Sequence, residues 1–183
     1  MEEKEMKFSF IIPVYNCGQY LDKFIREIED VNLSNYEIIL VDDGSTDDSG
    51  NICDSIAQKN ENVYCIHQKN QGVASARNNG LQIARGDYIC FFDADDNIIP
   101  EKLNKLLGQI ENSTTVIDIA VFGMSFDYYH RGKVYRSDLM QPLLQGGDTT
   151  EWRQKLVELF YSNSLSSICN KVFRRSFLVE KNL

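Results

Sequence analysis

Short apolar runs alternate with helical patterns along this chain, and this alternation limits the possible folds more than any other feature. Apolar, β-branched and aromatic residues predict strands at 7–12, 36–41, 62–67, 87–92 and 117–123. The segments between these runs carry apolar residues at helical spacing. Strands separated by helices form βαβ units, whose parallel sheet is covered on both faces. The pattern therefore predicts a single α/β domain with a Rossmann-like, mostly parallel sheet flanked by helices.

Local signals indicate where several elements begin. Asn16 is expected to cap the helix that follows the first strand, and Pro100 suits the first position of a later helix. Residues 125–138 are typical of a hairpin with Gly132 near its turn. A further helix is expected over 148–160.

The composition disfavours several classes of protein. With a formal net charge of -8, nonspecific attraction to nucleic acid is unfavourable. No window approaches the ~20 apolar residues of a membrane helix, and the acidic start MEEKEMKF is not that of a signal peptide. None of the five cysteines lies in a CxxC pair, which is typical of reduced thiols. We therefore expect a cytoplasmic protein.

Polar turns follow three of the expected strands: PVYN at 13–16, DDGS at 42–45 and DADD at 93–96. Ligands of such sheets bind beyond the carboxyl ends of the strands, so these turns should meet in one crevice. Three carboxylates in DADD repel one another unless they share a cation. A solvated turn before a helix is the alternative, but acids after two strands of one sheet favour a site.

The kind of cation is indicated by the binding motifs that the sequence does not match. An EF-hand loop starting at Asp93 would need glycine where Ile98 stands and glutamate where Asn104 stands. Neither a P-loop nor a dinucleotide fingerprint occurs. His67 and His130 lack the spacing of zinc ligands. A site of oxygen ligands for Mg²⁺ or Mn²⁺, bridging a diphosphate, is the interpretation left.

Arg77 is the expected positive partner of this cluster. The helix expected over 73–84 starts after Gly72, so its free N–H groups can face an anion. Arg77 lies about one turn further and can add a forked contact to phosphate or base. An ordinary surface salt bridge is the alternative.

Four segments together resemble the nucleotide-binding half of glycosyltransferase family 2, which has the GT-A fold. They are SFIIPVYNCGQYL, EIILVDDGSTDDS, NQGVASARNNGL and GDYICFFDADD. The resemblance covers residues 7–123, with a looser echo at 166–178, and the four segments in this order are highly specific. It implies a donor-binding half at 1–123 and a partial acceptor-side region at 124–183.

The resemblance also implies roles for individual residues. Pro13 and Tyr15 resemble the wall against which the nucleobase lies. Asp43 resembles the acceptor of a uracil N–H, with Asp42 beside it in the same turn, and this favours UDP. Arg77 resembles a contact to the nucleotide.

The acidic turn takes the remaining roles that the resemblance implies. Asp93 and Asp95 are the DxD motif that brackets ribose and metal, and Asp96 either shares the metal or meets the donor sugar. The family's general base lies in an acidic segment downstream of the part matched here. Glu180 lacks matching flanks, so we expect the base beyond Leu183 and the chain to be a piece of a longer protein.

The implied reaction is sugar transfer with inversion from a nucleoside-diphosphate sugar to a glycan or glycolipid acceptor. Such enzymes serve cell-surface polysaccharide or glycolipid synthesis, and one without a membrane helix can work at the inner face of the membrane. A non-catalytic nucleotide-sugar binding module is the main alternative. A haloacid dehalogenase-type phosphatase is a remote one, because its DxD normally follows the first strand.

Overall fold

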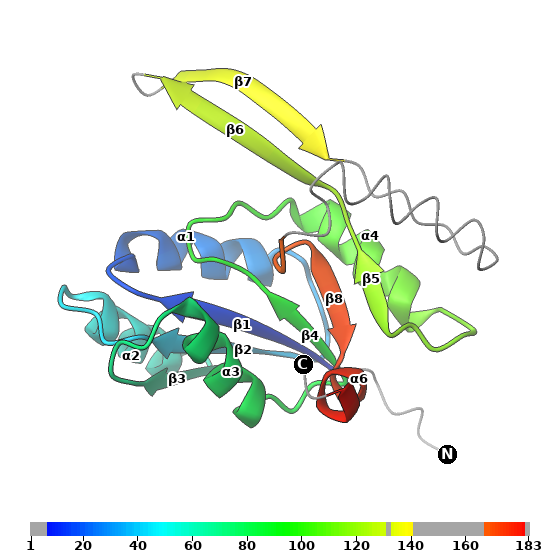
Figure 1. The fold of residues 1–183 in the computed structure, drawn as a ribbon, viewed down its shortest axis with the longest axis horizontal. Coiled ribbons are helices and arrows are strands. Elements are labelled where there is room, and N and C mark those ends of the chain that lie inside the picture. Colours follow the sequence, from blue (N-terminus) through cyan, green and yellow to red (C-terminus); the bar gives the residue numbers. More distant parts are fainter. Residues whose placement is uncertain (1–6, 131–132, 141–166, 182–183) are drawn as a thin grey trace. The chain divides into compact units, whose positions relative to one another are not determined.

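The computed structural model describes residues 7–130, 133–140 and 167–181 (Figure 1). These residues form two compact units. The first contains 7–118 and 172–181, and the second contains the described part of 119–171.

The first unit is built around a sheet whose strands lie in the order β3-β2-β1-β4-β8. β1, β2, β3 and β4 are parallel, whereas β8 runs antiparallel to β4. The bounds are β1 (Phe8–Val14), β2 (Tyr36–Asp42), β3 (Val63–His67), β4 (Tyr88–Phe91) and β8 (Lys171–Arg174). The predicted α/β fold with a mostly parallel sheet is confirmed, and β8 is a strand that the sequence pattern did not predict.

Helices follow each of the parallel strands, as the alternation predicts. They are α1 (Gly18–Glu29), α2 (Ser49–Lys59), α3 (Val73–Ile83), α4 (Pro100–Glu111) and α6 (Arg175–Lys181), the last after β8. Pro100 is the first residue of α4, as expected, because its fixed φ and missing N–H suit that position.

The sheet is covered on both faces. On one face Phe10 of β1 packs on Phe92 with ring centroids 6.1 Å apart, and Phe92 packs on Phe24 of α1 at 5.9 Å. On the other face α3 comes so close that a Cβ on Gly80 would lie 2.5 Å from Cγ2 of Ile11. Neighbouring residues of one strand therefore face different helices, as a strand buried on both sides requires.

The second unit contains β5 (Ile119–Val121) and an antiparallel hairpin of β6 (Met124–His130) and β7 (Lys133–Met140). The predicted hairpin is thus confirmed, with a register shift between Tyr128 and Tyr129. Its turn at 131–132 and the helix expected over 148–160 lie outside the described residues.

Two further expectations concern cysteines and membrane helices. All five cysteines, each of them described, are free, in agreement with the expectation of reduced thiols. Within the part of the chain that the structure describes, no helix has the length and apolar character needed to span a bilayer.

Glu37 at the start of β2 is a buried carboxylate that links three segments. Its side chain accepts hydrogen bonds from Lys7 Nζ at 2.8 Å, Ser9 Oγ at 2.6 Å and the Arg85 N–H at 2.5 Å. Burial raises the pKa of Glu37, but these donors outweigh it and hold the pKa below its ordinary value. Glu37 therefore stabilises the fold in its ionised form.

We expect Glu37→Gln to lower the free energy of unfolding by about 2–4 kcal/mol at pH 7, because the amide loses the charge and opposes the buried donors. The contribution should be complete above the ordinary glutamate pKa of 4.5 and be lost as the pH falls through the lower pKa of the folded state. Urea denaturation from pH 7 to pH 3 measures both effects. Glu29→Gln, an exposed change in α1, is the control, and equal stability of the two variants would contradict the prediction.

Candidate functional site

Three polar turns meet at one edge of the sheet. They follow β1, β2 and β4, which are neighbours in the sheet order. The strands are parallel, and Val14 pairs with Asp42 while Ile11 pairs with Phe91. The expectation that PVYN, DDGS and DADD lie at the carboxyl ends of adjacent strands is therefore confirmed.

The turn after β2 is held by its own polar atoms. Asp42 is buried and accepts the Ser45 N–H at 3.0 Å, while the Asp43 N–H donates to the Val14 carbonyl at 2.8 Å. Gly44 has a φ of 71°, and a Cβ there would lie 2.7 Å from the backbone nitrogen of Asn70. Only glycine meets both demands without strain, so the turn depends on it.

Asn16 has a different role from the one expected. It does not cap α1, whose N-cap is Cys17. Asn16 has a φ of 51°, and its Oδ1 accepts the backbone N–H groups of Thr46 at 2.8 Å and Asp47 at 3.3 Å. The expected cap is wrong because the unpaired N–H groups of the neighbouring turn take the same side-chain oxygen.

Asp43 organises the loop that leads into α3. Its Oδ1 accepts hydrogen bonds from Gln68 Nε2 at 2.7 Å and the Gln71 N–H at 2.8 Å, and its Oδ2 accepts the Gly72 N–H at 2.9 Å. The residue is only 3% exposed. A carboxylate has about four lone-pair sites, so one further donor can still be accepted. A contact between Asp43 and a nucleobase stays a prediction.

Sequence reasoning missed Gln68, a supporting residue of this loop. Its Oε1 accepts a hydrogen bond from Asn79 Nδ2 at 2.5 Å, so the loop is tied to α3 as well as to Asp43. The segment NQG signals a turn, but nothing in its local pattern indicates that Gln68 is a partner of Asp43.

The residues expected to form the nucleobase wall lie at the end of β1. Pro13 is half-buried within the strand. Tyr15, just after the strand, is 49% exposed and leaves an aromatic ring accessible for stacking. Their contact with a base stays a prediction.

Arg77 joins α3 to the acidic turn after β4. Its Nη2 lies 2.5 Å from Asp93 Oδ1, and the two side chains are 17% and 44% exposed. α3 starts after Gly72, at the loop that Asp43 holds, and this fixes where Arg77 lies along the edge. The structure thus brings the expected positive partner to the expected anionic cluster.

The acidic turn is compact. The Asp96 N–H donates to the Asp93 carbonyl, and the Asp93 N–H donates to Asp96 Oδ2, both at 3.0 Å. Burial raises the pKa of Asp96 to about 6, and the nearby charges of Asp93 and Asp95 act in the same direction. Asp95 is exposed.

This turn suits a hard divalent cation. Carboxylate oxygens of Asp93 and Asp96 lie within 4.8 Å of each other, which is close enough for both to reach one ion. Oxygen donors are the ligands that Mg²⁺ and Mn²⁺ prefer, and a cation would favour the ionised form of Asp96. Asp93 and Asp96 therefore fit the cation that the sequence led us to expect, whereas Asp95 is not part of this group and its role as a ligand stays a prediction.

Comparison with known proteins relates this chain to sugar-transferring enzymes. The model of the family "Glycosyl transferase family 2" matches residues 9–180. Glycosyltransferase GlyG of Streptococcus pneumoniae is 38% identical over 66% of this chain and 39% of its own length. The uncharacterized glycosyltransferase YibD of Escherichia coli is 29% identical over 97% of this chain and 51% of its own length. The chain spans about half the length of such relatives.

Solved structures show the same fold. TarS 1-349 of S. aureus in complex with UDP-GlcNAc has a TM-score of 0.71 at 24% identity, covering 97% of this chain and 48% of that one. The mannosyltransferase PcManGT of Pyrobaculum calidifontis, in complex with GDP-Man and Mn²⁺, has a TM-score of 0.63 at 17% identity, covering 98% and 47%. These neighbours are GT-A glycosyltransferases, and the comparisons give no support to the phosphatase alternative.

We expect Asp43→Asn to loosen the loop before α3, because one of its carboxylate oxygens becomes an amide that cannot accept an N–H. The free energy of unfolding should fall by about 1–3 kcal/mol, and the Gln71 and Gly72 amides should exchange faster with solvent. Hydrogen exchange followed by NMR measures this. Asp30→Asn, an exposed change after α1, is the control. Unchanged exchange at both amides would show that Asp43 does not hold the loop.

Proposed function

The chain belongs to glycosyltransferase family 2, and from this premise we propose that it moves a sugar from a nucleoside-diphosphate sugar to an acceptor hydroxyl. One observation carries the proposal: the ion pair between Arg77 and Asp93 at the edge where the three turns meet. Carboxylates can hold the cation that bridges a diphosphate, and a guanidinium can add a forked contact to its oxygens. The donors named for the two structural neighbours, UDP-GlcNAc and GDP-Man, support a nucleotide sugar.

In this proposal the nucleobase lies against Pro13 and Tyr15. Tyr15 stacks on the base through its exposed ring, and Asp43 accepts the ring N–H that a uracil presents. Asp42 supports the same turn through its bond to the Ser45 N–H. UDP is the favoured nucleotide because Asp43, an acceptor, matches that donor.

The diphosphate lies at the acidic turn. Asp93, Asp95 and Asp96 would hold Mn²⁺ or Mg²⁺, which would offset the negative charge of the leaving diphosphate. Arg77 exchanges part of its contact with Asp93 for a contact with the nucleotide. The Mn²⁺ named for PcManGT supports this assignment, as do the oxygen ligands of the turn.

The acceptor that we propose is a hydroxyl of a glycan or glycolipid in cell-surface polysaccharide synthesis, with inversion at the anomeric carbon. Inversion requires a base that removes the hydroxyl proton. The alternative proposal is donor binding without turnover, and it is kept because the chain spans about half the length of its relatives. Donor binding is therefore the property to measure first.

We expect UDP to bind this chain only weakly without Mn²⁺ and at least tenfold more tightly with it, because the cation joins two anionic partners. Asp95→Asn should remove most of the Mn²⁺-dependent gain. Isothermal titration calorimetry on both proteins measures this, with the exposed Asp22→Asn as the control. The proposed cation site would be refuted if UDP affinity were the same with and without Mn²⁺, or if Asp95→Asn kept the full Mn²⁺-dependent gain in affinity.

Tyr15→Ala tests the base-binding part of the site separately. Loss of aromatic stacking on a base typically costs about 1–3 kcal/mol, so UDP affinity with Mn²⁺ should fall by a factor of roughly 5 to 160. Affinity for inorganic pyrophosphate with Mn²⁺ should stay the same, because that ligand has no base. Parallel titrations compare the two ligands, and Tyr20→Ala, a change of an exposed side chain in α1, is the control. An equal loss for both ligands would argue against stacking.

A further inference from the structure

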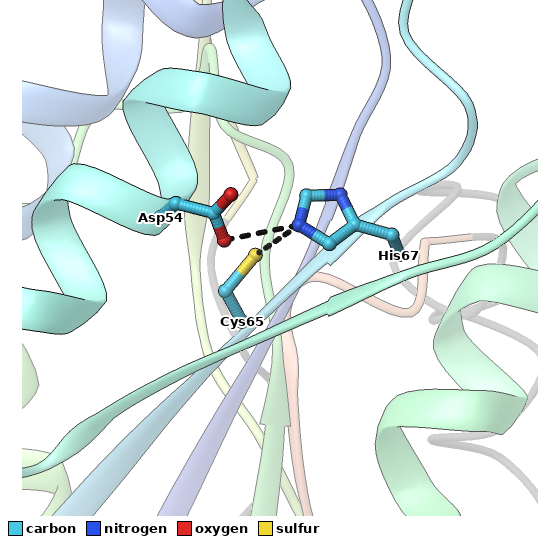
Figure 2. A group of neighbouring side chains, drawn as sticks. All are labelled: Asp54, Cys65 and His67. Atoms are coloured by element: carbon cyan, nitrogen blue, oxygen red, sulfur yellow. Dashed lines mark hydrogen bonds and ion pairs between the residues drawn. The ribbon is translucent and has the colours of Figure 1, made fainter.

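Three side chains with metal-binding atoms converge where α2 covers β3. Asp54 comes from α2, whereas Cys65 and His67 are two apart on β3 and share one face of the strand. Figure 2 shows the Asp54 carboxylate and the Cys65 sulfur approaching the same ring nitrogen of His67. His67 Nε2 lies 3.0 Å from Asp54 Oδ1 and 3.5 Å from Cys65 Sγ.

These separations are close to those between ligands of one tetrahedral cation. With bonds of about 2.3 Å to sulfur and about 2.0–2.1 Å to nitrogen and oxygen, tetrahedral angles place the ligand atoms roughly 3.3–3.6 Å apart. The three atoms of the cluster all lie within 4.8 Å of one another. Small side-chain adjustments would therefore bring all three to bonding distance of one ion.

A fourth residue orients the histidine from behind. Asp42 Oδ2 lies 2.9 Å from His67 Nδ1, so the imidazole presents Nε2 to Asp54 and Cys65. A carboxylate on the far nitrogen is the usual support of a metal-binding histidine, because it fixes the ring and makes it a better ligand. Asp42 is buried and fixed by Ser45, whereas Asp54 and His67 are about half exposed, which leaves a path for an ion.

We propose that Asp54, Cys65 and His67 form a binding site for a borderline-soft divalent cation, Zn²⁺, with Asp42 as the support of His67. Three protein ligands leave a fourth position for water. Sulfur and imidazole select such a cation over Mg²⁺ and Mn²⁺, which prefer oxygen. This site is separate from the acidic turn after β4, whose ligands are carboxylates.

Without metal, the cluster is held by hydrogen bonds. The His67 ring lies between two carboxylates, with Nδ1 2.9 Å from Asp42 Oδ2 and Nε2 3.0 Å from Asp54 Oδ1. Zn²⁺ would take the place of the proton on His67, which is released on binding.

The test is a titration with Co²⁺, which replaces Zn²⁺ and gives colour, in a phosphine reductant that keeps the thiols free. We expect one equivalent of Co²⁺ to produce the near-ultraviolet band of a cobalt thiolate and the visible bands of tetrahedral cobalt, and Zn²⁺ to abolish both. The thiolate band requires a cysteine ligand, so Asp95→Asn in the acidic turn should leave it unchanged, whereas Cys65→Ser decides which thiol gives it.

Variants assign the ligands. Cys65→Ser should lose the thiolate band, and Asp54→Asn and His67→Gln should each weaken Co²⁺ binding at least tenfold. Asp42→Asn should weaken it by about 10–100-fold, as changes to the partner of a ligating histidine do. Cys17→Ser and Asp48→Asn are the matched controls, because both lie outside the cluster. Circular dichroism checks the fold of each variant, and the exposed Asp54 is the change least able to disturb it.

Three results would overturn the proposal. They are absence of the band in the unchanged protein, persistence of the band in Cys65→Ser, and an Asp54→Asn variant that binds Co²⁺ like Asp48→Asn. The first result would leave the cluster as a histidine hydrogen-bonded between two carboxylates. The second would assign the metal to another thiol.

Discussion

The parallel pairing of β1 with β2 and β4 is the constraint on which the rest of the first unit depends. β1 lies at the centre, and its Phe10, Ile11 and Ile12 are completely buried. Parallel neighbours send their carboxyl ends to one edge, so burial of apolar side chains brings three polar turns together. A shift of one residue in register would exchange the faces of Phe10 and Ile11, and hence the packing on α1 and α3. The position of the site is thus decided by the apolar core.

At that edge, the carboxylates differ in how their charge is balanced. Backbone N–H groups satisfy Asp43, and Arg77 pairs with Asp93. Burial alone would raise the pKa of Asp42, but Ser45 and His67 reverse the effect. Asp96 differs, because burial prevails there and raises its pKa to about 6. A cation bound at the acidic turn would therefore stabilise the ionised form of Asp96, which agrees with the cation that we propose for the donor diphosphate.

The two cation sites that we propose differ in chemistry and are joined through the turn after β2. The acidic turn offers carboxylate oxygens, whereas Asp54, Cys65 and His67 offer oxygen, sulfur and nitrogen. Asp42 supports His67, and its neighbour Asp43 holds the loop before α3, the helix that carries Arg77. An ion bound by Asp54, Cys65 and His67 would hold Asp42 in place through His67. The next residue, Asp43, contacts the nucleobase in our proposal. Donor affinity with and without Zn²⁺ would therefore report on coupling between the sites.

Local patterns in the sequence are enough to predict the alternation of strands and helices and the turns at the ends of β1, β2 and β4. Burial periodicity and turn chemistry are local, so they can be read from neighbours in the chain. Tertiary structure decided the rest. β8 is a strand because it pairs with β4. Asn16 does not cap α1, because its side-chain oxygen accepts the N–H groups of Thr46 and Asp47 instead. Likewise, the convergence of Asp54 with Cys65 and His67 depends on how α2 packs on β3. Such contacts join residues far apart in the chain, and only packing of the whole unit brings them together.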